Sequence, residues 1–115
     1  MKSKDQRNYL DFVPMKNSDI EYQTDANGIV TLFVEWKGFY HRIAQKFFHR
    51  PRVSDIKLDA YGSFVWLSID DTMNVHQLSK VLDAKYPDME KSLSRLIKFL
   101  EILRDNRMIH WKGET

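Results

Sequence analysis

The sequence contains no cysteine among its 115 residues, which excludes disulfides, thiol catalysis and zinc–thiolate sites. No apolar run approaches the roughly 20 residues of a membrane-spanning helix. The first residues, MKSKDQRNYL, also lack the apolar region of a signal peptide. Neither sign of charge dominates, because 18 Lys and Arg residues stand against 16 Asp and Glu residues. These absences predict a soluble cytoplasmic protein, and the net charge of +2 does not by itself indicate nucleic acid binding.

The apolar content that is present suffices for the core of one domain, since 43% of the residues are hydrophobic and 13% are aromatic. Residues 1–18 are mostly polar and predict an N-terminal tail that is flexible in part, followed by a domain over residues 19–115. The apolar residues between Tyr9 and Val13 are exceptions in this tail. Packing on the outside of a sheet, a dimer contact and docking to a partner protein are three interpretations of them.

Residues 20–36 predict a β-hairpin. Asn27 and Gly28 form a strong signal for a tight turn, because both residue types tolerate positive φ. The segment IVTLFVEW that follows is rich in β-branched and aromatic residues, as strands are. We expect a third strand over residues 53–58 to pair with the strand at 29–36 and to leave its other side open. An exposed edge of this kind can accept an added strand.

Residues 37–52 form a basic and aromatic insertion without any acidic residue. The spacing of Phe39, Ile43 and Phe47 predicts a short amphipathic helix. Such a segment can bind phosphates or an acidic peptide, although a solvated helix face is the simpler interpretation. No acidic residue or cysteine lies near its histidines in the sequence to complete a metal site.

Three helices are predicted after the third strand. The Asp59 carboxylate can cap the first, which is apolar over most of its circumference and therefore buried. Asn74 and Gln77 predict a capping box at the start of the second. Asp88 is the expected N-cap of the third, over residues 89–106. The adjacent Asp70 and Asp71 indicate a solvated turn, not a catalytic or metal-binding pair.

The third predicted helix has two apolar surfaces. The inward stripe at helical spacing consists of Met89, Leu93, Leu96, Ile97, Leu100 and Leu103. Phe99 and Ile102 lie off this stripe, beside a rim of basic residues. They could pack on the sheet, or they could form one wall of a peptide groove. The chain then ends in a short extended segment, in which Trp111 is expected to be a packing anchor.

Three segments together resemble a known family: IAQKFFHRPRVSDIKLDAYGSFVWLSIDD, NVHQLSKVLDAKYPD and SLSRLIKFLEILRDNRMI. They resemble the PqqD-like family, relatives of the coenzyme pyrroloquinoline quinone synthesis protein D, whose fold is also called the RiPP precursor peptide recognition element. The resemblance covers about residues 13–111.

The resemblance implies an α+β, winged-helix-like fold, in which a three-stranded antiparallel sheet is followed by a three-helix bundle. It implies a module that is not an enzyme and needs no cofactor. Such a module binds the leader of a ribosomally made precursor peptide and presents it to a tailoring enzyme, often a radical SAM protein. The leader adds as a strand beside the third strand, in a groove walled by the third helix. Within these regions, spacing selects the candidate peptide-binding residues Ile56, Lys57, Leu58, Arg95, Lys98, Phe99 and Ile102.

Other functions stay open at this point. A winged-helix DNA-binding protein is the main alternative, since three helices with strands are also a DNA-binding shape, but the near balance of acidic and basic residues argues against it. An enzyme would need a nucleophile, a base and an oxyanion donor together, which the sequence does not display. A homodimer that exchanges its apolar N-terminal stretch is a further alternative. The insertion at 37–52 could cover the sheet edge or contact a partner enzyme.

Overall fold

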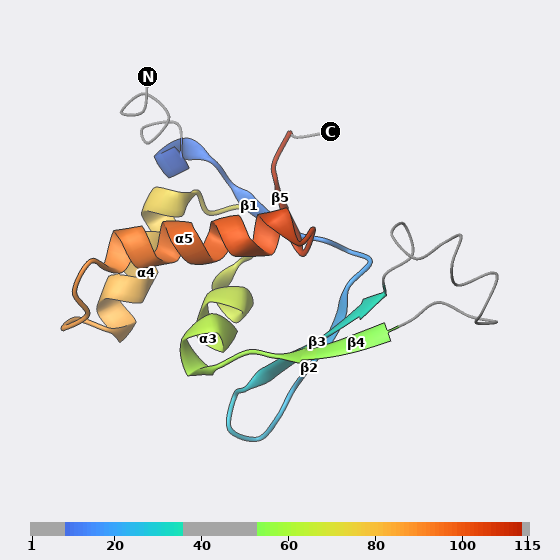
Figure 1. The fold of residues 1–115 in the computed structure, drawn as a ribbon. Coiled ribbons are helices and arrows are strands. Elements are labelled where there is room, and N and C mark those ends of the chain that lie inside the picture. Colours follow the sequence, from blue (N-terminus) through green and yellow to red (C-terminus); the bar gives the residue numbers. More distant parts are fainter. Residues whose placement is uncertain (1–8, 36–52, 114–115) are drawn as a thin grey trace. The chain divides into compact units, whose positions relative to one another are not determined.

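The computed structural model describes residues 9–35 and 53–113 of the chain (Figure 1). In chain order, the elements with printed bounds are β1 (Pro14–Lys16), β2 (Glu21–Thr24), β3 (Val30–Glu35), β4 (Val53–Lys57), α3 (Ala60–Ser68), α4 (Val75–Lys85), α5 (Ser92–Asp105) and β5 (Ile109–Trp111). This is an α+β protein with a three-stranded antiparallel sheet in the order β2-β3-β4, as predicted. The helix predicted within residues 37–52 lies outside the described ranges.

The chain forms two compact units, and the division between them falls within α3. One unit is Ser18–Phe64, which holds the three-stranded sheet. The other consists of Met1–Asn17 and Val65–Thr115, which hold α4, α5 and a second sheet of β1 and β5. None of the helices in the described ranges is long and apolar enough to cross a membrane.

The hairpin of β2 and β3 confirms the prediction for residues 20–36, but its turn differs in detail. The Asp25 carboxylate accepts hydrogen bonds from the N–H groups of Asn27 and Ile29, at 2.8 and 3.0 Å. These bonds lower the pKa of Asp25, with the bond from Ile29 contributing most. Within this turn Gly28 takes a positive φ, of 82°, and Asn27 does not. The Asp25 side chain stabilises a longer loop, which needs one left-handed residue instead of two.

Helix α3 begins where it was predicted to begin. The Gly62 N–H donates to the Asp59 carboxylate over 2.7 Å, which satisfies one of the free donors of the first turn. Val65, Trp66 and Ile69 are buried. Leu67 is 44% exposed, so the expectation that the helix is buried over most of its circumference does not hold at this position.

Helix α4 confirms the predicted capping box. The Gln77 N–H donates to the Asn74 side chain over 2.8 Å, and the Asn74 N–H donates to the Gln77 side chain over 2.9 Å. Of the four predicted inward residues, Val75, Leu78 and Leu82 are buried and Val81 is half-buried. Two reciprocal bonds within four residues therefore determine where this helix starts.

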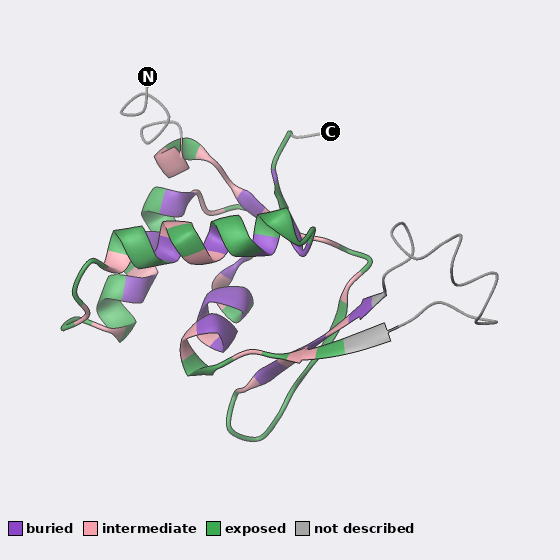
Figure 2. Ribbon diagram, viewed as in Figure 1, coloured by how far each residue is buried: buried purple, intermediate pink, exposed green. Residues whose placement is uncertain are grey.

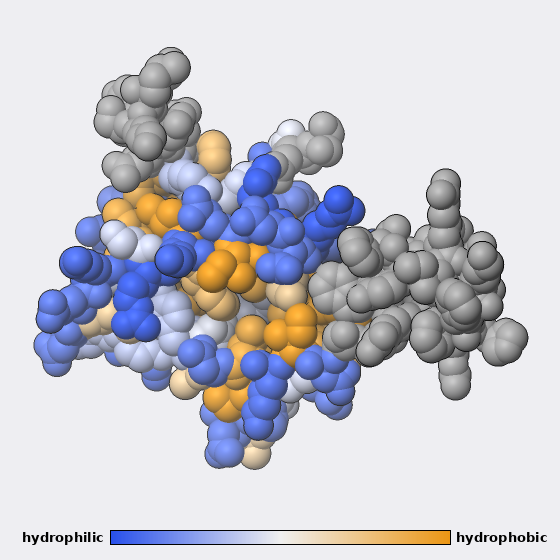
Figure 3. Space-filling view, in the orientation of Figure 1, coloured by the Kyte–Doolittle hydropathy of each residue, from blue (hydrophilic) through white to orange (hydrophobic). Residues whose placement is uncertain are grey.

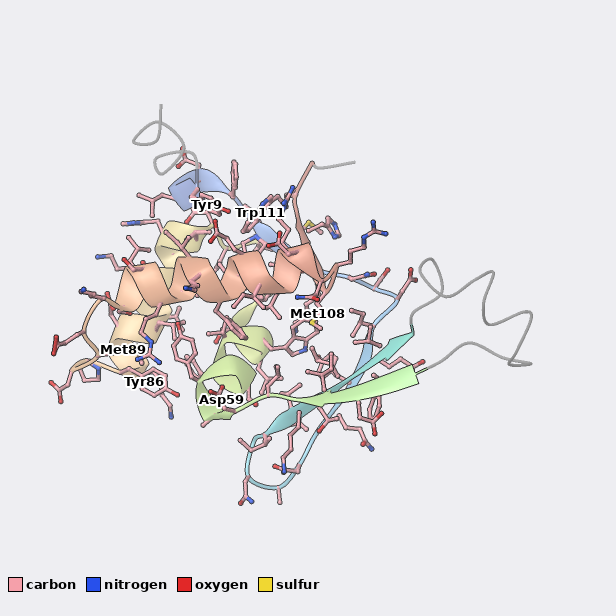
Figure 4. All side chains as sticks on the ribbon, viewed as in Figure 1. Tyr9, Asp59, Tyr86, Met89, Met108 and Trp111 are labelled. Atoms are coloured by element: carbon pink, nitrogen blue, oxygen red, sulfur yellow. The ribbon has the colours of Figure 1, made fainter. Side chains whose placement is uncertain are left out.

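Helix α5 begins at Ser92, three residues after the predicted start at Met89. The N-cap residue is Lys91, whose φ of 53° is left-handed, so a regular helix cannot continue through it from Met89. The Met89 N–H instead donates to the Tyr86 C=O and closes a separate turn, where Figure 4 labels both residues. The prediction that Asp88 caps this helix is therefore wrong.

The inward stripe of α5 is confirmed in its middle. Leu96, Leu100 and Leu103 are buried, whereas Leu93 is 38% exposed. Figure 2 shows buried and exposed positions alternating along α5, as expected for a helix with one apolar stripe. The sequence pattern thus identified the buried face but extended it too far toward the N-terminus.

The two ends of the described chain pair with each other. β1 runs antiparallel to β5, with Met15 opposite His110. Bonds from Asn17 N–H to Met108 C=O and from Lys112 N–H to Val13 C=O continue this pairing on both sides. The sequence predicted an extended C-terminal segment, but it did not predict its partner.

A cluster of three aromatic rings joins the N-terminal residues to strand β5. Trp111 is 7% exposed, and its ring centroid lies 5.5 Å from that of Tyr9 and 5.2 Å from that of Phe12. Figure 4 shows the Tyr9 and Trp111 side chains near each other. Trp111 is a packing anchor, as predicted, and the apolar N-terminal residues Tyr9 and Phe12 contact the C-terminal strand.

Replacing Tyr9 with phenylalanine is expected to reduce the loss of stability at high pH. The Tyr9 hydroxyl donates to the Glu101 carboxylate over 2.8 Å, and burial followed by this bond raises the pKa of Tyr9 from 10.0 to about 12. The folded state therefore holds the phenol proton more tightly than the unfolded chain, so this stabilisation is complete below the unfolded pKa and disappears as the pH rises through the folded pKa.

The measurement is urea denaturation of wild type and Tyr9→Phe at about pH 9 and about pH 11.5. The free energy of unfolding should fall more steeply with pH in wild type, since all other titrating groups are shared. An equal fall in both proteins would contradict the assignment.

Candidate functional site

Strand β4 forms one border of the three-stranded sheet within the described residues. It pairs with β3 alone, in a register that places Ile56 opposite Leu32 and Lys57 opposite Thr31. This confirms the predicted neighbour of β4. Strand β2 forms the other border, so the described sheet has two edges and the site must be assigned to one of them on further grounds.

One hydrogen bond and the register show which way the backbone groups of β4 point. The Leu58 N–H donates to the Val30 C=O over 2.9 Å. Opposed residues in an antiparallel ladder alternate between bonded and non-bonded pairs, so Ile56, two residues before Leu58, also bonds toward β3. Asp55 and Lys57 therefore direct their N–H and C=O groups away from β3, toward the outer edge.

The opposite side of β3 supports this alternation. The Asp25 N–H donates to the Ile29 C=O over 3.0 Å, which places Ile29 and Thr31 in bonded pairs with β2. The alternate residues Val30 and Leu32 therefore form their hydrogen-bonded pairs with β4. Both sides of the central strand thus give the same assignment.

The side chains of β4 divide between two faces. Ile56 is half-buried and shares its face with the buried Leu32, because directly opposed residues point to the same side of a sheet. Asp55 and Lys57 are exposed on the other face. The residues that present their backbone to the edge are therefore also the residues that present charge to the solvent.

The transition from β4 to α3 ends the strand sharply. The Val30 N–H donates to the Ser63 hydroxyl over 2.8 Å, and the Val30 C=O accepts from the Leu58 N–H. Ser63 is buried in α3, and Asp59 caps this helix directly after the strand. The described edge is short, because β4 ends at Lys57, one residue before the end of the predicted strand.

The four candidate residues on α5 lie on one flank of that helix. Arg95, Lys98, Phe99 and Ile102 follow the spacing i, i+3, i+4, i+7. Ile102 is 49% exposed, Arg95 and Lys98 are exposed, and Phe99 is half-buried. Figure 3 shows hydrophobic residues reaching the surface among hydrophilic ones on the face in view. This flank carries two apolar and two basic side chains, and it adjoins the buried stripe at Phe99.

Each set of candidates is grouped within its own unit. Ile56, Lys57 and Leu58 lie at β4 in Ser18–Phe64, and the four helix residues lie in the unit that contains α5. Asp55, which the sequence reasoning did not select, joins Lys57 at the outer edge, whereas the backbones of Ile56 and Leu58 are bonded to β3. A sequence alone does not show this, because the direction of a backbone group depends on the pairing partner.

The titratable side chains of the described residues do not assemble into a metal site, since no group of three or more His, Asp and Glu residues is arranged to hold an ion there. Asp70 is exposed, and hydrogen bonds from the backbone and side chain of Thr72 lower its pKa, as in the predicted solvated turn. Asp71 is half-buried and accepts a bond from the Lys16 N–H over 3.0 Å, so it supports β1.

The fold and this edge define an α+β protein whose antiparallel sheet ends in a strand with outward-directed backbone groups. The family model described as Coenzyme PQQ synthesis protein D (PqqD) matches residues 50–109, which is more than half of the 115-residue chain. The chain belongs to the PqqD family. The matched stretch contains all the candidate residues on β4 and α5. No curated protein and no solved structure matches the chain.

Proposed function

We propose that this protein is a non-catalytic recognition module for a ribosomally made precursor peptide. Its leader segment adds as a fourth strand at the outer edge of β4 and is presented to a tailoring enzyme of the radical SAM type. Residues 19–115 form a winged-helix-like domain in this proposal. The observation that carries it is the outward direction of the backbone groups of Asp55 and Lys57.

Strand addition suits this edge for a physical reason. A guest strand satisfies the outward N–H and C=O groups with little demand on sequence, and side-chain contacts then supply specificity. The apolar surface of Phe99 and Ile102 suits leader side chains, and the charges of Arg95 and Lys98 favour acidic ones and speed the encounter.

The family match supports β4 over β2 as the site of addition. Residues 50–109 include β4 and exclude β2. Both strands are edges within the described part of the chain, and the geometry alone does not separate them. The shared stretch also includes α5, whose exposed flank is a candidate contact surface within its own unit.

The test is a titration with a synthetic leader, taken from a precursor gene adjacent to the gene of this protein, followed by amide shifts and hydrogen exchange. The Asp55 and Lys57 amides should shift and become protected, because they gain an acceptor. The Ile56 and Leu58 amides already donate to β3, so their protection should change less. Unchanged Asp55 and Lys57 amides at saturating peptide would refute the proposal.

Two alternative outcomes have separate signatures. Protection of the Asp55 amide that grows with protein concentration, without peptide, would indicate a homodimer through this edge. Binding to random duplex DNA that weakens steeply with added salt would indicate the DNA-binding alternative. Light scattering and a salt series measure these two outcomes directly.

A further inference from the structure

We propose that the segment bound at β4 carries an acidic residue followed two positions later by a basic residue. The acidic residue lies opposite Lys57 and the basic residue lies opposite Asp55. This inference rests on the proposed function, because it specifies the sequence of the strand that is added there.

The alternation of charge at the outer edge is the first observation behind it. Asp55 and Lys57 are exposed, two residues apart, and therefore on the same face of β4. Because both residues direct their backbone toward the edge, each would form a hydrogen-bonded pair with a residue of the guest. Directly opposed side chains in such a ladder have Cβ atoms about 4.5–5.5 Å apart, close enough for charges to interact.

The direction of the guest determines the order of its charges. Every pair of strands in the described sheet is antiparallel, and antiparallel pairing is slightly more stable per residue than parallel pairing. A guest that runs antiparallel to β4 passes Lys57 first and Asp55 two residues later. An acid-x-base order then places opposite charges together at both positions, whereas base-x-acid places like charges together.

The two positions should not contribute equally. Lys57 already interacts with the carboxylate of Asp25, where it adds to the lowering of the Asp25 pKa that the Ile29 and Asn27 N–H groups mainly cause. A guest acid would have to compete with that carboxylate. Asp55 makes no ion pair with any residue of the described ranges, so a guest base opposite it should be the stronger determinant.

The test uses three synthetic peptides of equal length on a neutral Thr and Val background. One has a central Glu-Thr-Lys, one has Lys-Thr-Glu, and one has Gln-Thr-Gln. Each is titrated at low salt into wild type and into the double variant Asp55→Lys, Lys57→Asp. Both substituted residues are exposed, and thermal denaturation of the double variant checks that the fold is retained.

Wild type should bind Glu-Thr-Lys about tenfold more tightly than Lys-Thr-Glu, with the neutral peptide between them. The double variant should reverse this order, and added salt should reduce the difference in both proteins. Single variants Asp55→Asn and Lys57→Gln should show the larger loss of preference for Asp55→Asn.

The outcomes separate this inference from the proposed function. If all three peptides protect the Asp55 and Lys57 amides with equal affinity in both proteins, the charge rule is wrong and strand addition stands. A preference for Lys-Thr-Glu in wild type overturns the antiparallel order. If no peptide protects these amides, strand addition at β4 fails, and the charge rule fails with it.

Discussion

Replacing Asp55 with proline is expected to weaken leader binding by about tenfold or more while leaving the protein folded. The Asp55 N–H points away from β3, so its removal costs no bond of the existing sheet, and proline is tolerated in an edge strand when its nitrogen faces outward. The guest strand would lose a hydrogen bond worth about 0.5–1.5 kcal/mol and would meet the proline ring instead.

Two matched variants make this result specific. Asp55→Ala removes the same charge but keeps the N–H, so the difference in dissociation constant between the alanine and proline variants reports the lost backbone bond together with the obstruction by the proline ring. Ile56→Pro, one residue further, removes an N–H directed at β3 and should destabilise the sheet by about 1–3 kcal/mol, because the partner C=O on β3 loses its donor. Isothermal titration and thermal denaturation measure both effects. Equal leader affinity of Asp55→Pro and Asp55→Ala would show that no strand adds at this edge.

Replacing Trp111 with alanine is expected to lower the free energy of unfolding by about 3–5 kcal/mol. The side chain is 7% exposed and packs against the rings of Tyr9 and Phe12, so the substitution removes buried apolar area and leaves a cavity between the two ends of the chain. A loss of this size is a large part of the roughly 5–15 kcal/mol that stabilises a typical domain.

His110→Ala is the matched control, because His110 is the neighbouring residue of β5 and is exposed. Its effect should stay within about 0.5 kcal/mol, as is usual for surface substitutions. Urea denaturation followed by circular dichroism measures both variants. If Trp111→Ala kept full stability and instead lost leader affinity, Trp111 would be a ligand contact and its role as a packing anchor would be wrong.

Local signals in the sequence predicted the starts of two helices. Asp59 caps α3, and Asn74 with Gln77 caps α4, because each set of bonds involves residues within four positions of one another. The start of α5 was predicted wrongly at Met89. Lys91 is left-handed and breaks the helix, and no glycine at this position indicates the break in the sequence. Left-handed conformations are routine only for Gly and occasional for Asn and Asp, so a lysine gives no local signal for one.

The candidate site was predicted in part. The hydrophobic pattern located the edge strand and the off-stripe flank of α5, because side chains repeat with periods of about 2 and 3.6 residues. It did not identify Asp55, which enters the proposal through the direction of its backbone groups and not through the side-chain pattern. The pairing of β1 with β5 was missed for a related reason, as the partners lie at opposite ends of the sequence.

The sequence by itself determined most of the strand and helix positions, the middle of the buried helix stripes and the family that the chain resembles. The tertiary structure decided which residues of β4 direct their backbone groups to the outer edge of the sheet, and that β1 pairs with β5. The physical reason is that side-chain alternation is a property of one strand, whereas the direction of its hydrogen bonds is set by the register with its neighbour.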